Sequence, residues 1–119
     1  MYTTFAFAKK SADSKFEKID IQRNVAGDDD VTFKLKYCGI CHTDTFISEN
    51  GMGMTSYPCV PGHELAGVVT SVGKNVTKVK PGDLVGVGCM VDSCGQCVMC
   101  QQGEEQFCLE GNRSGGSRR

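Results

Sequence analysis

The sequence predicts a mainly β domain whose short strands form a closed or partly open barrel. Tryptophan is absent and glycine is abundant, at 15 of 119 residues, which favours a turn-rich β fold over a helical bundle. Several short stretches of strand character follow one another, and turn-forming residues separate them. At this length the chain suits one domain.

The first third of the chain contains three predicted strands. Residues 3–8 form a short strand, and residues 15–22 alternate only partially, which is typical of an edge strand. Three aspartates at 28–30 mark a turn, interpreted as a solvated hairpin tip rather than a metal site. Residues 31–37 alternate regularly, so a half-buried strand is expected whose apolar face comprises Val31, Phe33, Leu35 and Tyr37.

The middle of the chain continues this pattern with one helical interruption. Residues 38–44 leave the third strand and open a short helix. Residues 50–61 form a loop rich in glycine and methionine that ends at two prolines. A buried strand over 65–72 and a final strand over 84–87 follow, with turns at Gly73-Lys74-Asn75 and Pro81-Gly82-Asp83.

Charge and hydropathy exclude some functions. Lysine and arginine (13) balance aspartate and glutamate (14), giving a net charge of −1 and no basic footprint for nucleic acid. The sequence contains no run of about 18 apolar residues, so no membrane span is expected. The N-terminal charges follow the short apolar run instead of preceding it, unlike a secretory signal.

The eight cysteines are the strongest chemical signal in the sequence. Within the 89–110 lobe, four thiols are spaced Cys-x2-Cys-x2-Cys-x7-Cys, which suits a tetrahedral zinc ion: Cys94, Cys97, Cys100 and Cys108. This spacing favours zinc over disulfides. It also departs from the ferredoxin run, in which the last gap is three and proline follows. A structural zinc site and a reducing, cytoplasmic compartment are therefore expected.

Residues 111–119 contain no apolar side chain. Such a segment buries too little surface to offset the entropy lost on ordering. The sequence predicts a flexible tail there, following a domain over 1–110.

A second constellation comprises Cys41 and the run Gly62-His63-Glu64. Thiolate and imidazole are ligands that zinc prefers, and Glu64 directly follows the histidine. Asp44 is placed to accept the other N–H of His63, and Thr43 offers a hydroxyl near the thiolate. By spacing alone, a cysteine and a histidine this far apart are more often core residues than ligands, so the residues leave both interpretations open.

Taken together, these strings resemble a known family. They are Tyr37-Cys-Gly-Ile-Cys-His-Thr-Asp44, Tyr57-Pro-Cys-Val-Pro-Gly-His-Glu-Leu-Ala-Gly-Val-Val69, Gly82-Asp-Leu-Val-Gly-Val87 and the four-cysteine lobe. In this order the sequence resembles the zinc-dependent alcohol dehydrogenases of the medium-chain dehydrogenase/reductase family, and the cinnamyl alcohol dehydrogenase branch in particular. The resemblance covers residues 5–109. It implies a GroES-like, partly open barrel with a zinc-binding four-cysteine lobe.

The resemblance also implies roles for individual residues. Cys41 and His63 would bind a catalytic zinc, with Glu64 behind the metal and able to ligate it. Thr43 would pass on the substrate hydroxyl proton, and Asp44 would orient His63. His42 would lie near the cofactor pyrophosphate, although an exposed polar residue at a helix start remains the alternative. Phe46 stands where many members have a relay histidine, so it is expected to wall the substrate pocket.

The resemblance covers only the zinc-binding part of the family pattern. Members are about three times this length; their Gly-rich nucleotide-binding unit and third catalytic cysteine have no counterpart here. The implied function is the zinc-binding domain of an enzyme that interconverts primary alcohols and aldehydes with NADP or NAD. The chain alone is expected to be inactive. The alternative is a zinc-stabilised binding module without catalysis, with self-association through an exposed domain face.

Overall fold

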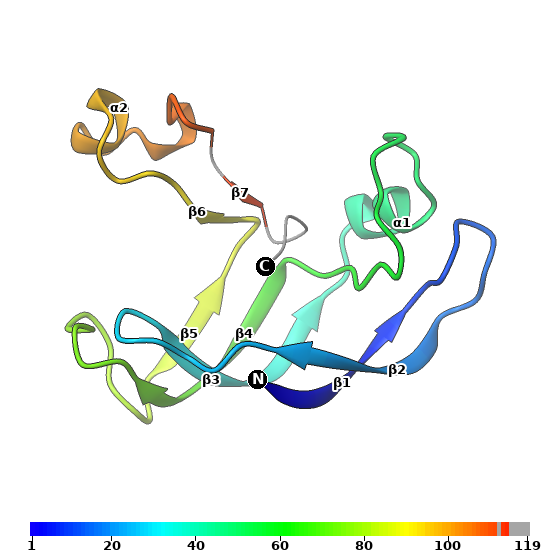
Figure 1. Cartoon of the computed structure of the whole chain (residues 1–119), viewed down its shortest axis with the longest axis horizontal. Coiled ribbons are helices and arrows are strands. Elements are labelled where there is room, and N and C mark those ends of the chain that lie inside the picture. Colours follow the sequence, from blue (N-terminus) through cyan, green and yellow to red (C-terminus); the bar gives the residue numbers. More distant parts are fainter. Residues whose placement is uncertain (112, 115–119) are drawn as a thin grey trace.

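The computed structural model describes residues 1–111 and 113–114, which form three small antiparallel sheets (Figure 1). The first sheet is a hairpin of β1 (Tyr2–Ala8) and β2 (Glu17–Arg23). The second has the strand order β3-β4-β5, from β3 (Val31–Gly39), β4 (Glu64–Val72) and β5 (Leu84–Val87). The third pairs β6 (Met90–Asp92) with β7 (Arg113–Ser114).

Three short helices accompany the sheets in the described part of the chain. Helix α1 (His42–Ser48) follows β3 directly, where the sequence predicts a short helix. Helix α2 (Val98–Gln101) and the 3-10 helix η1 (Glu105–Phe107) lie in the four-cysteine lobe, shown in orange in Figure 1. None of the helices in the described part of the chain has the length and apolarity needed to cross a bilayer.

The sheets do not close into a barrel over the described residues. In Figure 1 the β1–β2 hairpin extends to the right and β5 lies to the left, and an isolated bridge pairs Lys9, just after β1, with Cys59 in the loop before β4. The radius of gyration, 15.6 Å, exceeds the roughly 13.5 Å expected for a compact domain of this length. The partly open form of the predicted mainly β fold is therefore confirmed.

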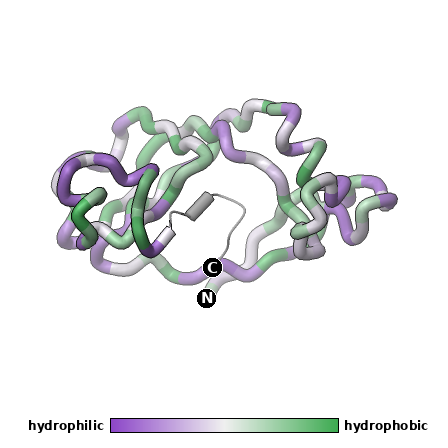
Figure 2. The backbone as a smooth tube through the Cα atoms, turned by 90° about the horizontal axis from the view of Figure 1, so that it is seen from above, coloured by the Kyte–Doolittle hydropathy of each residue, from purple (hydrophilic) through white to green (hydrophobic). Residues whose placement is uncertain are grey.

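The hydrophobic core is small. Among the described residues the buried apolar side chains are Ala8, Cys59, Val69 and Cys108. Figure 2 shows hydrophobic segments distributed around the whole tube instead of gathered in one centre. Many large apolar side chains stay in contact with solvent, so burial alone contributes little to holding the parts together.

The predicted apolar face of the third strand is not buried as expected. Tyr37 is 77% exposed and Leu35 50%, while Phe33 is intermediate. Register shifts between Thr32 and Phe33, and between Leu35 and Tyr37, interrupt the pairing with β4. Because a bulge inserts an extra residue, it breaks the simple two-residue alternation on which the expectation rested.

Residues 84–87 do form a strand, but it is not the last one. Strands β6 and β7 follow it, and both are short and poor in alternation, which is why no periodic signal marks them. The tail predicted over 111–119 falls largely outside the described residues. Within it, Arg113 and Ser114 form β7 and pair with Asp92 and Met90.

Candidate metal centres

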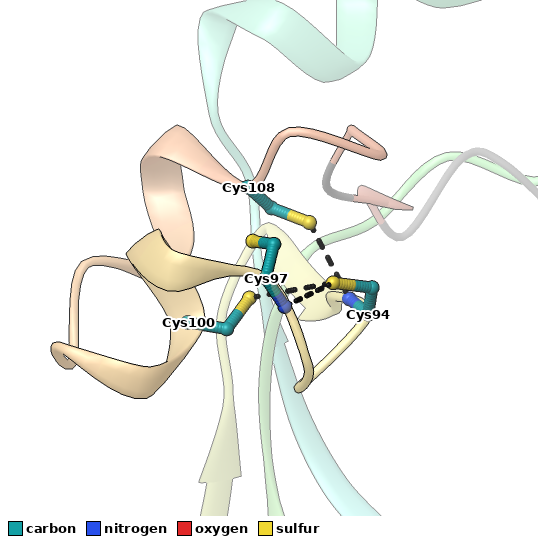
Figure 3. A group of neighbouring side chains, drawn as sticks. All are labelled: Cys94, Cys97, Cys100 and Cys108. Atoms are coloured by element: carbon teal, nitrogen blue, oxygen red, sulfur yellow. Dashed lines mark hydrogen bonds between the residues drawn. The ribbon is translucent and has the colours of Figure 1, made fainter.

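The four-cysteine lobe brings its sulfurs together in the arrangement that a tetrahedral ion needs (Figure 3). All four ligand atoms lie within 4.8 Å of one another, and the Cys94 and Cys100 sulfurs are 3.9 Å apart. Zinc–sulfur bonds of about 2.3 Å at tetrahedral angles place sulfurs about 3.8 Å apart. The four cysteines are free thiols. The donor set and spacing therefore fit one zinc ion.

Backbone amides point at these sulfurs. The Cys97 and Gln96 N–H groups donate to the Cys94 sulfur at 3.3 and 3.4 Å, and the Cys94 N–H donates to the Cys108 sulfur at 3.4 Å. Such donors stabilise the thiolate form that binds metal. The tight turn before α2 thus aims amides and sulfurs at a common point.

In the metal-free lobe the thiols of Cys97 and Cys100 differ widely in pKa. Hydrogen bonds from the Cys100 and Leu109 backbone lower the pKa of Cys97 to about 6. A hydrogen bond with Ser93 acts to lower the pKa of Cys100, but burial and hydrogen bonds with Cys97 and Cys108 outweigh it and raise that pKa to about 11. Of these two thiols, Cys97 is therefore the one that ionises at neutral pH.

Alkylation of the metal-free chain checks this difference. At pH 7 a thiol of pKa about 6 is mostly thiolate, the nucleophilic form. We expect iodoacetamide to modify Cys97 before Cys100, measured by peptide mass spectrometry over time. Bound zinc should protect all four. Modification of Cys100 ahead of Cys97 in the metal-free chain would contradict the assignment.

A second cluster forms where β3 passes into α1 beside the start of β4. The ligand atoms of Cys41, His63 and Glu64 lie within 4.8 Å of one another. Antiparallel pairing of β3 with β4, which sets Gly39 opposite Glu64, brings these distant parts of the chain together. Gly62 has a φ of 133°, a conformation rarely adopted by other residues, so glycine permits the chain to turn into His63.

One carboxylate holds both of the principal ligands. Asp44 Oδ1 lies 3.0 Å from His63 Nδ1, and Asp44 Oδ2 accepts the Cys41 N–H at 3.0 Å. The Asp44 side chain is only 11% exposed, so water competes weakly for these bonds. Because a carboxylate is an acceptor, His63 donates from Nδ1, which leaves Nε2 as the ring nitrogen available to a metal.

The electrostatics of the cluster favour cation binding. Hydrogen bonds from the backbone and hydroxyl of Thr43, then from His63, lower the pKa of Cys41. The hydrogen bond with Cys41, then the charge of Asp44, raise the pKa of His63 against the effect of burial. With thiolate, carboxylate and neutral imidazole, the ligand charges sum to −2, which matches a divalent ion. The residues therefore fit zinc here as well.

The structure also places the other predicted residues. His42 is exposed at the first position of α1. Phe46 packs against Gly51 in the loop after α1, where an added side-chain carbon would overlap its ring. Asp44 holds His63 as the sequence predicts, and it also caps α1 at Cys41, a role that was not predicted from the sequence. The Cys-x2-Asp spacing of a helix start was the signal that pointed to it.

Comparisons with known proteins show which family the chain resembles. Residues 27–118 match the family model described as the alcohol dehydrogenase GroES-like domain. This chain is 54% identical over 101 residues to probable cinnamyl alcohol dehydrogenase 5 of Oryza sativa subsp. japonica, covering 85% of this chain and 28% of that protein. It is 51% identical over 104 residues to probable mannitol dehydrogenase 1 of Stylosanthes humilis, covering 87% and 29%.

Solved structures share the fold of this chain. A cinnamyl alcohol dehydrogenase from Sorghum bicolor superposes with a TM-score of 0.89 at 45% identity, over 97% of this chain and 33% of that one. An enzyme from Helicobacter pylori, complexed with NADP(H), gives 0.84 at 40% identity, over 94% and 32%. The chain spans about a third of the length of these relatives. It belongs to the alcohol dehydrogenase GroES-like domain family.

Proposed function

We propose that this chain is the zinc-binding catalytic domain of an alcohol dehydrogenase that interconverts primary alcohols and aldehydes with NADP(H). The convergence of Cys41, His63 and Glu64, braced by Asp44, carries the proposal. Similarity to proteins named cinnamyl alcohol dehydrogenase, and to a structure complexed with NADP(H), supports the substrate class and the cofactor.

Each residue of the cluster then has a task. Cys41, His63 and Glu64 would hold a zinc ion, which when bound supplies a Lewis acid for an alcohol or aldehyde oxygen. Asp44 fixes the ring orientation of His63. The Thr43 hydroxyl, already hydrogen-bonded at the Cys41 sulfur, would accept and pass on the substrate proton. His42 would face the cofactor pyrophosphate from the exposed start of α1.

The remaining two thirds of the relatives' length would carry the nucleotide, so we expect no hydride transfer by residues 1–119 alone. A chimaera tests the catalytic role. Residues 1–110 replace the matching N-terminal part of the Oryza sativa relative, and NADPH oxidation is followed with an aromatic aldehyde. We expect measurable turnover by the chimaera and none by the isolated chain.

His63→Ala in the chimaera is the matched loss-of-function variant, because it removes one metal ligand and leaves the four-cysteine lobe intact. It should lower kcat/KM by at least about a hundredfold, the size typical of removing a group at the reacting centre. A folded chimaera without turnover, or one whose turnover survives His63→Ala, would refute the catalytic assignment.

A second candidate function is a zinc-stabilised binding module without catalysis. Large apolar side chains exposed on β1 and on β3 favour it, because exposed apolar surface can be buried on association: Phe5, Phe7, Leu35 and Tyr37. We propose that this surface permits self-association of the isolated chain. Sedimentation velocity across a hundredfold concentration range tests it, and a monomer throughout would argue against it. The free cysteines support the cytoplasm as the compartment.

A further inference from the structure

We propose that Gly39 is a positioning residue for the second metal centre: its missing side chain is what allows the Glu64 carboxylate to reach the metal beside Cys41 and His63. The inference rests on the metal site of the proposed function. It concerns a residue that neither binds metal nor contacts substrate.

The two residues face each other across the β3–β4 pair, with Gly39 directly opposite Glu64. A Cβ atom added at Gly39 would overlap the Glu64 carboxylate oxygen Oε2. It would also lie 2.9 Å from the Glu64 Cβ and 3.1 Å from Cδ. Ordinary carbon–carbon contacts are about 3.5–4.0 Å, so the Glu64 side chain and any side chain at position 39 compete for one space.

The backbone of Gly39 does not itself demand glycine. Its φ is outside the left-handed region in which the positive-φ glycines of the described chain lie. An alanine can therefore adopt this backbone, and its cost comes from the contact with Glu64 alone. Rotation of the exposed Glu64 side chain toward solvent relieves the Oε2 and Cδ overlaps and takes the carboxylate away from the ligand cluster, while the 2.9 Å contact with the Glu64 Cβ requires a small shift of the strands.

Loss of that carboxylate matters because it is the third ligand and half of the negative charge. With Glu64 turned away, Cys41 and His63 would remain, whereas catalytic zinc sites keep three protein ligands. Because Gly39 has no side chain, Glu64 can occupy this space and serve as the third ligand of the centre.

The test is cobalt(II) binding to the full chain after one equivalent of zinc has filled the four-cysteine lobe, verified by protection of its thiols from alkylation. We expect Gly39→Ala to weaken cobalt binding about 10- to 100-fold, as for loss of an outer-shell partner, and to change the cobalt absorption spectrum as Glu64→Ala does. Gly88→Ala is the control, because nothing lies within 4 Å of its added Cβ.

A double-mutant cycle separates positioning from general disruption. In the Glu64→Gly background, which also lacks the Cβ at position 64, Gly39→Ala should have no further effect on cobalt affinity. If Gly39→Ala alone fails to fold, Glu64→Gly should restore folding by removing every overlapping atom, and failure to restore it would overturn the proposal. So would wild-type affinity in Gly39→Ala, or an equal loss in both backgrounds. Absence of any second cobalt in the wild-type chain would overturn both this proposal and the metal site beneath it.

Discussion

Replacing Cys97 by serine is expected to unfold the four-cysteine lobe while leaving β1 to β5 folded. The lobe has little apolar burial of its own, since Phe107 is 64% exposed and Leu109 67% exposed. Structural zinc contributes roughly 10–16 kcal/mol of apparent binding free energy in small zinc domains. A serine hydroxyl is a poor substitute for a thiolate, so most of that stabilisation should disappear.

Hydrogen exchange with mass spectrometry measures this outcome peptide by peptide. Residues 89–110 should exchange as an unfolded segment in Cys97→Ser, and equally in the wild-type chain treated with a chelator. Cys89→Ser is the matched control, because Cys89 is exposed and lies outside the ligand group. Persistent protection of the lobe without zinc would show that packing, and not metal, holds it.

The second large effect is expected from Asp44→Asn. Asparagine offers one acceptor oxygen where the carboxylate serves two donors, the Cys41 N–H and the His63 Nδ1–H. One of these partly buried donors loses its partner, at a cost of about 1–3 kcal/mol in unfolding free energy. The ring of His63 also loses its orientation, so affinity at the second metal centre should fall about 10- to 100-fold.

Cobalt titration of the zinc-preloaded chain and urea unfolding measure the two consequences separately. Asp30→Asn is the control, because Asp30 also accepts a backbone N–H, from Gly27, in an exposed turn far from any ligand. A stability loss without a change in cobalt affinity would show that Asp44 only caps α1. If neither stability nor cobalt affinity changes, Asp44 is not part of the metal site.

The lobe was predictable from the sequence because its chemistry is local. Four thiols within one short turn-rich segment lie close to one another independently of how the rest of the chain folds. The second centre depends on the pairing of β3 with β4, which spacing along the chain does not encode. Cys41 and His63 could be joined only through the family resemblance. The relation between Gly39 and Glu64 is a cross-strand register, visible only in three dimensions.

The largest difference between the sequence-based prediction and the structure concerns the burial of the strand over residues 31–37. Alternation in residues 31–37 indicates correctly that a strand forms, and α1 begins near its predicted position. Alternation also suggests a covering layer for the apolar face, yet Leu35 and Tyr37 are exposed and bulges interrupt the register. A strand pattern reports the tendency of side chains to be covered. It cannot report which other elements are present to cover them.

The shared carboxylate of Asp44 makes the first turn of α1 and the histidine ligand a single thermodynamic unit. The free energy by which the folded first turn of α1 favours the metal-binding orientation of His63 equals the free energy by which that orientation favours the folded turn, because coupling between two equilibria is reciprocal. A cation at Cys41 and His63 should therefore slow amide exchange in α1. Conversely, substitutions that fray this seven-residue helix should weaken the cation even when they touch no ligand. The stability of α1 should therefore depend on whether the metal centre is occupied, although the only ligand from this part of the chain is Cys41, the N-cap residue.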